Sequence, residues 1–241
     1  MSTQQRPRKV VRRPRTSTGT WQAEKSHLTR MQILEATMQC LVDLGYAQTT
    51  TEKIALQAGV SRGAMTHHFK SRAEVLAAAA AYITDRRAVE YDAAIKGISL
   101  PVEALPTLES MRETMVVLQK YYASPSFIAL QELLRGARTD KELMQIMAPL
   151  EERLDQSISE SIAKRFPVWT QFPETSELLR DLILSSMQGI AIDPVHFLEG
   201  ERLQRFLDLL ASVAITEFEK AYDAAHGPKA LRKAWAVRSA A

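Results

Sequence analysis

Residues 49–76 read TTTEKIALQAGVSRGAMTHHFKSRAEVL, and this stretch decides the fold. It predicts one short helix over residues 50–57 and a second over residues 61–68. Between them, Gly59 can adopt the positive φ that a tight turn needs, and Ser61 can cap the second helix with its hydroxyl. Two helices joined by so short a turn form a helix-turn-helix.

The second helix of this motif would present a polar edge to its surroundings. Ala64, Met65 and Phe69 fall on the side that faces the core. The other side carries a long hydrogen-bond donor, a glycine that allows close approach, a hydroxyl and an imidazole, and this set suits entry into the major groove of DNA. These outward residues are Arg62, Gly63, Thr66 and His67.

Outside the motif, apolar residues recur at three- and four-residue spacing from His27 onward, and runs of strand-like alternation are missing. The pattern predicts an all-α fold of about nine helices. We expect breaks between helices near Gly45, Gly59, Ser71, residues 97–106, Ser124, residues 136–140, 167–173 and 193–200.

Three predicted helix starts have the capping-box spacing, in which a hydroxyl accepts from the third helical N–H and a glutamate reaches back. The pairs are Thr49 with Glu52, Ser71 with Glu74, and Thr139 with Glu142.

Charge is divided unevenly along the chain, although its net charge is only +3. Up to Arg72 there are 12 Lys and Arg against 4 Asp and Glu, a balance of +8; the rest has 19 against 24, a balance of −5. This division suits a phosphate-rich partner for the first part, with chance asymmetry as the alternative. Residues 1–25 lack periodicity and carry Arg12, Arg13 and Arg15, which either enter a minor groove or attract phosphates without specificity.

Several classes of protein are disfavoured by the sequence. The single cysteine, Cys40, rules out an intrachain disulfide framework and a cysteine zinc site of ordinary spacing. The longest apolar run, residues 75–83, is far shorter than the roughly 20 residues that cross a bilayer, so we expect a cytoplasmic protein with no membrane contact. We find no Gly-rich phosphate loop, metal-spaced ligand set or serine elbow, and therefore expect no catalytic residues, no metal and no cofactor.

The helix-turn-helix region resembles the tetracycline-repressor (TetR) family of transcription regulators. The resemblance is carried by LVDLGY (41–46), TTTEKIA (49–55), AGVSRGAMTHHF (58–69) and KSRAEVL (70–76), about 50 residues in all. Beyond them only the length, the helical periodicity and LQELLRGARTDKEL (130–143) look like the family. The resemblance implies a three-helix DNA-binding head, a fourth helix that links it to the rest, and a divergent helical body that dimerises and binds a small effector.

The resemblance also implies roles for residues of the head. Thr50 matches a position that meets a DNA phosphate, whereas Arg62, Gly63 and His67 match positions that meet bases or phosphates. His68 and Phe69 match the family's His-Phe pair, and Lys70 matches a basic residue that contacts phosphate. Thr66 stands where the family usually has tyrosine, which puts one phosphate contact in doubt. The predicted DNA-binding set is Thr50, Thr51, Arg62, Gly63, Thr66, His67, His68 and Lys70.

From these observations we divide the chain into four parts. Residues 1–25 are expected to be a disordered basic arm, 26–72 the helix-turn-helix domain, 73–226 the effector-binding and dimerisation domain, and 227–241 a flexible tail. The implied partners are a palindromic operator duplex, a second copy of the chain and a small-molecule effector.

Two segments near the end of the body are candidates for the dimer interface. Residues 174–192 and 201–222 both carry broad apolar stripes, so they can form half of a four-helix interface, or can face only their own core. A dimer would place two heads in major grooves about 34–36 Å, or a multiple of it, apart. The candidate interface residues are Leu178, Leu182, Met187, Phe206 and Leu210.

Effector residues are harder to locate, because aromatic residues and methionines at helical spacing can equally be plain core. Trp169 is the strongest candidate, since it lies in a connection between Pro167 and Pro173. We expect a largely apolar effector whose binding releases the operator; a body without an effector and an activator are the alternatives. The candidate pocket residues are Met111, Met115, Leu118, Tyr121, Tyr122, Phe127, Trp169 and Phe172.

Overall fold

The computed structural model describes residues 18–98, 105–192 and 198–239. These residues form ten α-helices and one 3-10 helix, and they contain no strand. The all-α prediction is therefore confirmed, with one helix more than the nine expected. The elements are α1 (Thr18–Gln48), α2 (Thr51–Gln57), α3 (Arg62–His68), α4 (Arg72–Lys96), α5 (Leu108–Tyr122), α6 (Pro125–Ala137), α7 (Lys141–Arg165), η1 (Pro167–Gln171), α8 (Pro173–Ile192), α9 (Gly200–His226) and α10 (Ala230–Ser239).

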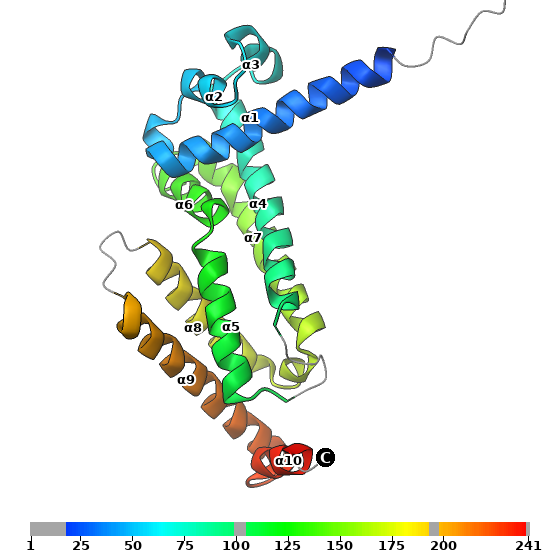
Figure 1. The fold of residues 1–241 in the computed structure, drawn as a ribbon, viewed down its shortest axis with the longest axis vertical. Helices are drawn as coiled ribbons and strands as arrows, with labels where there is room; N and C mark the ends of the chain where they lie inside the picture. Colours follow the sequence, from blue (N-terminus) through cyan, green and yellow to red (C-terminus); the bar gives the residue numbers. More distant parts are fainter. Residues whose placement is uncertain (1–17, 99–104, 193–197, 240–241) are drawn as a thin grey trace, which may run out of the picture.

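The helix-turn-helix lies at one end of an elongated molecule, and α10 lies at the opposite end (Figure 1). Helix α2 packs on α1 and α3 packs on α2, with Ile54, Met65 and Phe69 almost completely buried. Gly59 adopts φ +65 in the turn, as its place in the sequence predicts. The head is thus a small three-helix unit held by a few large apolar side chains.

The body is built around α4, which runs from the head along the long axis of the molecule beside α7 (Figure 1). Helix α5 packs against α9 and α8, and α6 packs under α1. One continuous cluster of buried apolar side chains extends from Ile33 in the head to Ile215 in the body. Head and body therefore share one hydrophobic core.

The N-terminal boundary differs from the expectation, whereas the break expected within α1 is present. Helix α1 begins at Thr18, inside the segment 1–25 that was expected to be a disordered arm, and the first 17 residues lie outside the described part of the chain. The expected break at Gly45 is present, since this residue has φ 75 and ψ 169 between two helical stretches.

The C-terminal segment forms a helix where a flexible tail was expected. Leu231 of α10 is fully buried beside Phe218, and the Asp223 carboxylate accepts hydrogen bonds from the N–H groups of Lys229 and Leu231 at 2.9 and 3.0 Å. One apolar side chain and one carboxylate therefore hold this helix to the end of α9.

One of the three predicted helix caps is confirmed. The Ser71 hydroxyl accepts from the Glu74 N–H at 3.1 Å. The other two were wrong by one residue, because Thr50 caps α2 and Asp140 caps α7. The Thr49 hydroxyl instead donates to the Gly45 carbonyl within the preceding turn.

Candidate nucleic-acid interface and ligand cavities

Helix α3 exposes the polar edge that the sequence predicts. The Ser61 hydroxyl begins the helix by accepting from the Ala64 N–H at 3.1 Å. Met65 and Phe69 are 2% and 1% exposed, so the helix is anchored on one side. The opposite side, which is open to solvent, carries Arg62, Gly63, Thr66 and His67.

A groove between α2 and α3 brings half of the predicted DNA-binding residues together. Its volume is about 520 Å³, and its lining includes Thr51, Arg62, Thr66 and Lys70. Thr50 lies at the start of α2, where its hydroxyl accepts from the Lys53 N–H at 3.3 Å. The remaining predicted residues lie on α3 outside this lining; they are Gly63, His67 and His68.

His68 differs from its neighbours because it is partly buried. Burial lowers its pKa, and the nearby charges of His67 and Arg30 lower it further. Its carbonyl accepts from the Arg30 guanidinium at 3.4 Å, and the same guanidinium lies 4.3 Å from the centre of the Phe69 ring. At neutral pH we therefore expect His68 to be uncharged and to act as a neutral hydrogen-bonding group.

A joint centred on Tyr46 connects the head to the body. Its N–H donates to the Glu132 carboxylate and its hydroxyl to the Asp140 carboxylate, both at 3.0 Å. The Arg72 guanidinium lies 4.4 Å from the Tyr46 ring centre and donates to the Tyr46 carbonyl at 2.5 Å. A Cβ on Gly136 would lie 2.7 Å from the ring, so only glycine fits under it. The sequence analysis did not identify this joint.

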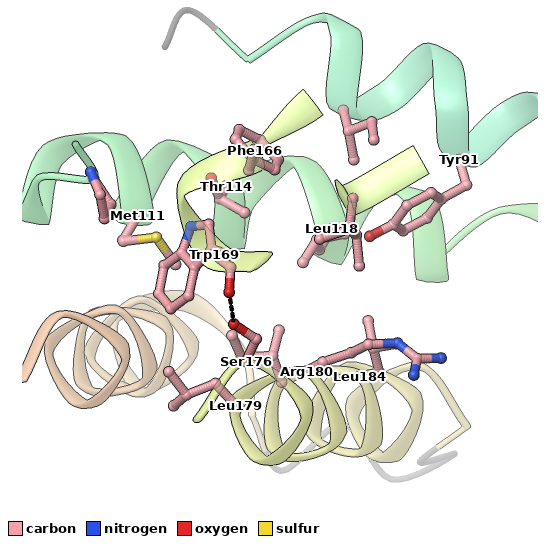
Figure 2. A pocket seen from close by; sticks show the side chains of 14 residues that line it. Tyr91, Met111, Thr114, Leu118, Phe166, Trp169, Ser176, Leu179, Arg180 and Leu184 are labelled. Atoms are coloured by element: carbon pink, nitrogen blue, oxygen red, sulfur yellow. Dashed lines mark hydrogen bonds between the residues drawn. The ribbon is translucent and has the colours of Figure 1, made fainter. Parts of the chain in front are cut away.

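An apolar cavity of about 100 Å³ lies in the body between α4, α5, α7, η1 and α8. Of the predicted effector residues, Met111, Leu118 and Trp169 line it. Figure 2 shows the Trp169 indole between Met111 on α5 and Leu179 on α8, with its carbonyl accepting from the Ser176 hydroxyl. Trp169 therefore lies at a cavity wall. It belongs to the short 3-10 helix η1 rather than to an irregular loop.

The other predicted effector residues do not line this cavity. Met115 and Tyr121 are core residues, exposed by 0% and 5%, and Phe172 packs its ring edge on Phe218 at 5.5 Å. Tyr122 and Phe127 line a separate cavity. Four of these five are buried and Phe172 is partly buried, but helical periodicity could not say which of them faced empty space.

The separate cavity has a volume of about 170 Å³ and contains buried charges that the sequence analysis missed. Arg87 is 2% exposed, and its guanidinium lies 4.1 Å from the ring centre of Tyr121 and 4.9 Å from that of Phe127. Arg87 Nε and Glu151 Oε1 are buried and have no hydrogen-bond partner within the described ranges. Burial lowers the pKa of Arg87 and raises the pKa of Glu151.

The Glu151 carboxyl leads to a prediction about stability. Burial outweighs the opposing effect of Arg87, so its pKa is higher in the folded protein than in the unfolded chain. Such a group makes folding less favourable as pH rises from the unfolded pKa through the folded one. We expect Glu151→Gln to raise Tm at pH 7 by a few degrees and to have no effect below about pH 4, measured by thermal unfolding. The neighbouring exposed Glu152→Gln is the control, and a lower Tm for Glu151→Gln at pH 7 would contradict the account.

Helices α8 and α9 leave an apolar face uncovered. Leu178 is 72%, Leu182 44% and Leu209 59% exposed, and Ile192 adds 37% at the end of α8. Phe206 is half-buried. Met187 and Leu210, which the sequence placed in a dimer interface, are 1% and 5% exposed and point into their own core. Both helices carry apolar residues on more than one side. The sequence prediction of the dimer interface therefore included two residues, Met187 and Leu210, from the side that faces the core.

Within the described ranges, no three His, Cys, Asp or Glu side chains are grouped so that they could hold a metal ion. No helix in those ranges is both long and apolar enough to cross a membrane.

Comparison with known sequences matches the head to one family. Residues 33–79 match the family described as "Bacterial regulatory proteins, tetR family". An uncharacterized HTH-type transcriptional regulator of Mycobacterium tuberculosis is 26% identical over 196 residues, which cover 79% of this chain and 97% of that protein. The HTH-type transcriptional regulator TtgR of Pseudomonas putida is 44% identical over 55 residues, or 23% of this chain and 26% of that protein.

Comparison of folds extends the similarity to the body. A putative TetR-family regulator from Mesorhizobium loti superposes with a TM-score of 0.62 at 15% identity, covering 80% of this chain and 97% of that one. A transcriptional regulator from Rhodococcus gives 0.56 at 19% identity, with 78% and 96% covered. At these identities the likeness concerns the fold.

Proposed function

Because this chain belongs to the tetR family of bacterial regulatory proteins, we propose that it is a homodimeric repressor that releases its operator when a small, largely apolar molecule enters the cavity beside Trp169. It is a transcriptional regulator; the proposal concerns its mechanism. The observation that carries the proposal is the solvent-exposed polar edge of α3, which is held in place by the buried Met65 and Phe69.

The exposed polar edge of α3 is proposed to recognise the base sequence of the operator. Arg62 can donate two hydrogen bonds to a guanine, and Gly63 lets the helix backbone approach the groove. Thr51 and Lys70 flank the same groove and are suited to phosphate contacts that set the position of the helix. A helix of seven residues reaches few base pairs, which is why we propose that two copies bind a palindrome together.

The second copy is proposed to cover the apolar face of α8 and α9. Leu178, Leu182 and Leu209 are too exposed to serve their own core, and an apolar patch of this kind is typical of an interface. Two helices from each copy would form a four-helix interface about a two-fold axis.

Helix α4 is proposed to transmit the effect of the ligand. Its first residue, Arg72, donates to the carbonyls of Thr49 and Tyr46 at the joint, whereas Tyr91 and Ile95 line the apolar cavity. The helix is continuous between them, over roughly 28 Å at 1.5 Å per residue. A ligand that favours one position of α4 would then change the separation of the two heads, and a coupling of about 1–3 kcal/mol lowers operator affinity about 5- to 150-fold.

Alanine at Arg62 tests the assignment of DNA reading. Because a side chain that reads bases contributes only where its base is present, Arg62→Ala should cost about 1–3 kcal/mol at particular base pairs and little at others. Fluorescence anisotropy on a panel of single-base variants of the selected operator measures this. Arg112→Ala, in the exposed surface of α5, is the matched control and should leave every affinity unchanged. If Arg62→Ala weakened binding equally on every DNA sequence, Arg62 would contact a phosphate rather than a base.

A further inference from the structure

The apolar cavity beside Trp169 offers few polar atoms to a ligand, and most of them are already engaged. The Thr114 hydroxyl donates to the Ser110 carbonyl at 2.8 Å, and the Ser176 hydroxyl donates to the Trp169 carbonyl at 2.6 Å (Figure 2). Neither hydroxyl has a proton left for a ligand.

Tyr91 is different, because its hydroxyl has no hydrogen bond in the described part of the protein although the residue is only 2% exposed. The ring is held edge-on against Tyr121, with the ring centres 5.2 Å apart. Figure 2 shows the hydroxyl pointing past Leu118 rather than back into α4. Burial raises the pKa of Tyr91, so the hydroxyl stays protonated and can donate. The hydroxyl is therefore a donor at the wall of a largely apolar cavity, with no acceptor in the described part of the protein, and a ligand can supply one.

Arg180 supplies a second donor on the same cavity wall. Its Nε is buried and has no hydrogen-bond partner within the described ranges. Its Nη2 forms an ion pair with the Asp155 carboxylate, so the positive charge already has a counter-ion. What Arg180 lacks is an acceptor for one N–H, not an anion.

We infer that the ligand of this cavity is a small, mostly hydrocarbon molecule with one uncharged oxygen acceptor, such as a ketone or aldehyde, which receives hydrogen bonds from Tyr91 and Arg180. The inference rests on the proposed function only in treating this cavity as the effector site. The apolar end of the molecule would lie against Trp169, Met111 and Leu179. A carboxylate is disfavoured because Asp155 already neutralises the guanidinium and the rest of the wall is apolar.

The size of the cavity limits the first probes. A cavity of about 150 Å³ binds benzene, so the about 100 Å³ present here admits a molecule of about six heavy atoms only if the walls move slightly apart. Cyclopentanone, methylcyclopentane and butanoate are of similar size. Cyclopentanone carries one uncharged oxygen acceptor, methylcyclopentane carries no acceptor, and butanoate carries a charged carboxylate. We expect cyclopentanone to bind roughly tenfold more tightly than butanoate, measured by ligand-observed NMR on the full-length protein without DNA. Methylcyclopentane measures the apolar contribution alone, because its affinity is set by its transfer out of water.

Two variants test the assigned donors. Tyr91→Phe should lower cyclopentanone affinity about three- to tenfold and leave methylcyclopentane affinity within about twofold, and Arg180→Met should do the same. Tyr82→Phe, on the same helix, and Arg153→Met, on α7, are the matched controls. Without ligand, Tyr91→Phe should unfold at the same temperature or higher, because the hydroxyl that it removes has no hydrogen-bond partner in the described part of the protein. If the Tyr91 hydroxyl instead stabilised the fold through a hydrogen bond, Tyr91→Phe would lower the unfolding temperature.

The outcomes separate this inference from the proposed function. If cyclopentanone binds as expected but leaves operator affinity unchanged, the ligand class stands and the release mechanism fails. The inference is overturned if butanoate binds as tightly as cyclopentanone, or if Tyr91→Phe and Arg180→Met both leave cyclopentanone binding unchanged.

Discussion

Replacing Leu178 with glutamate should convert the protein from a dimer to a monomer and lower its operator affinity by about 10²- to 10⁴-fold. Leu178 is the most exposed apolar side chain of the α8 and α9 face, at 72%. A carboxylate there would have to leave water on association without a partner, which is strongly unfavourable. Once the heads are no longer linked, each must bind its half-site alone, and the gain from tethering is lost.

Sedimentation velocity and operator titration measure the two effects on the same sample. Val89→Glu is the matched control, since Val89 is also an exposed apolar residue, at 69%, but lies on α4. Thermal unfolding of both variants establishes that the protomer remains folded. A Leu178→Glu protein that stays dimeric and binds operator normally would refute the assigned interface, and dissociation by Val89→Glu would move the interface to α4.

Valine at Gly136 should destabilise the protein by about 2–5 kcal/mol, which lowers Tm by roughly 4–20 °C. The first added carbon would already lie 2.7 Å from the Tyr46 ring, and the ring cannot move without giving up the hydrogen bond from its hydroxyl to Asp140. The expected cost combines this overpacking with the loss of that bond. Chemical denaturation of the purified variant measures it.

A double-mutant cycle identifies the cause. In a Tyr46→Ala background the ring is absent, so Gly136→Val should cost at least 1 kcal/mol less than it does in the native background. An equal cost in both backgrounds would show that the valine acts through its own helix, and the Tyr46 joint would lose its role as the connection between head and body.

The head could be predicted in detail because its constraints are local. The turn glycine, the capping serine and the alternation of Met65 and Phe69 with polar residues all lie within about 20 residues and agree with one another. Even there, pattern could not choose between Thr49 and Thr50 as the cap of α2, because adjacent hydroxyls are chemically equivalent and only the backbone decides.

The body could be predicted only as a set of helices. Helix α8 has apolar residues on more than one side, so periodicity alone could not separate the exposed Leu178 from the buried Met187. Trp169 was found because two prolines remove it from any helical stripe. Tyr91 and Arg180 were not, since an unpaired donor becomes visible only when every neighbouring side chain has been placed.

The joint between head and body depends on contacts that sequence pattern does not encode. Tyr46 lies 86 residues from Glu132 and 94 from Asp140 along the chain. Both ends do fall in segments quoted for their resemblance to the TetR family, LVDLGY and LQELLRGARTDKEL. The resemblance of both segments to one family was the only sign in the sequence that they belong together. The structure was needed to show that they are in contact.

Selection of bound duplexes from a random pool tests whether a pair of α3 helices reads an inverted repeat. The account predicts that the full-length protein at modest salt enriches an inverted repeat, with half-sites one helical turn or a multiple of it apart, because two copies of α3 enter major grooves related by a two-fold axis. Enrichment of no sequence, or of a single site without a repeat, would contradict it.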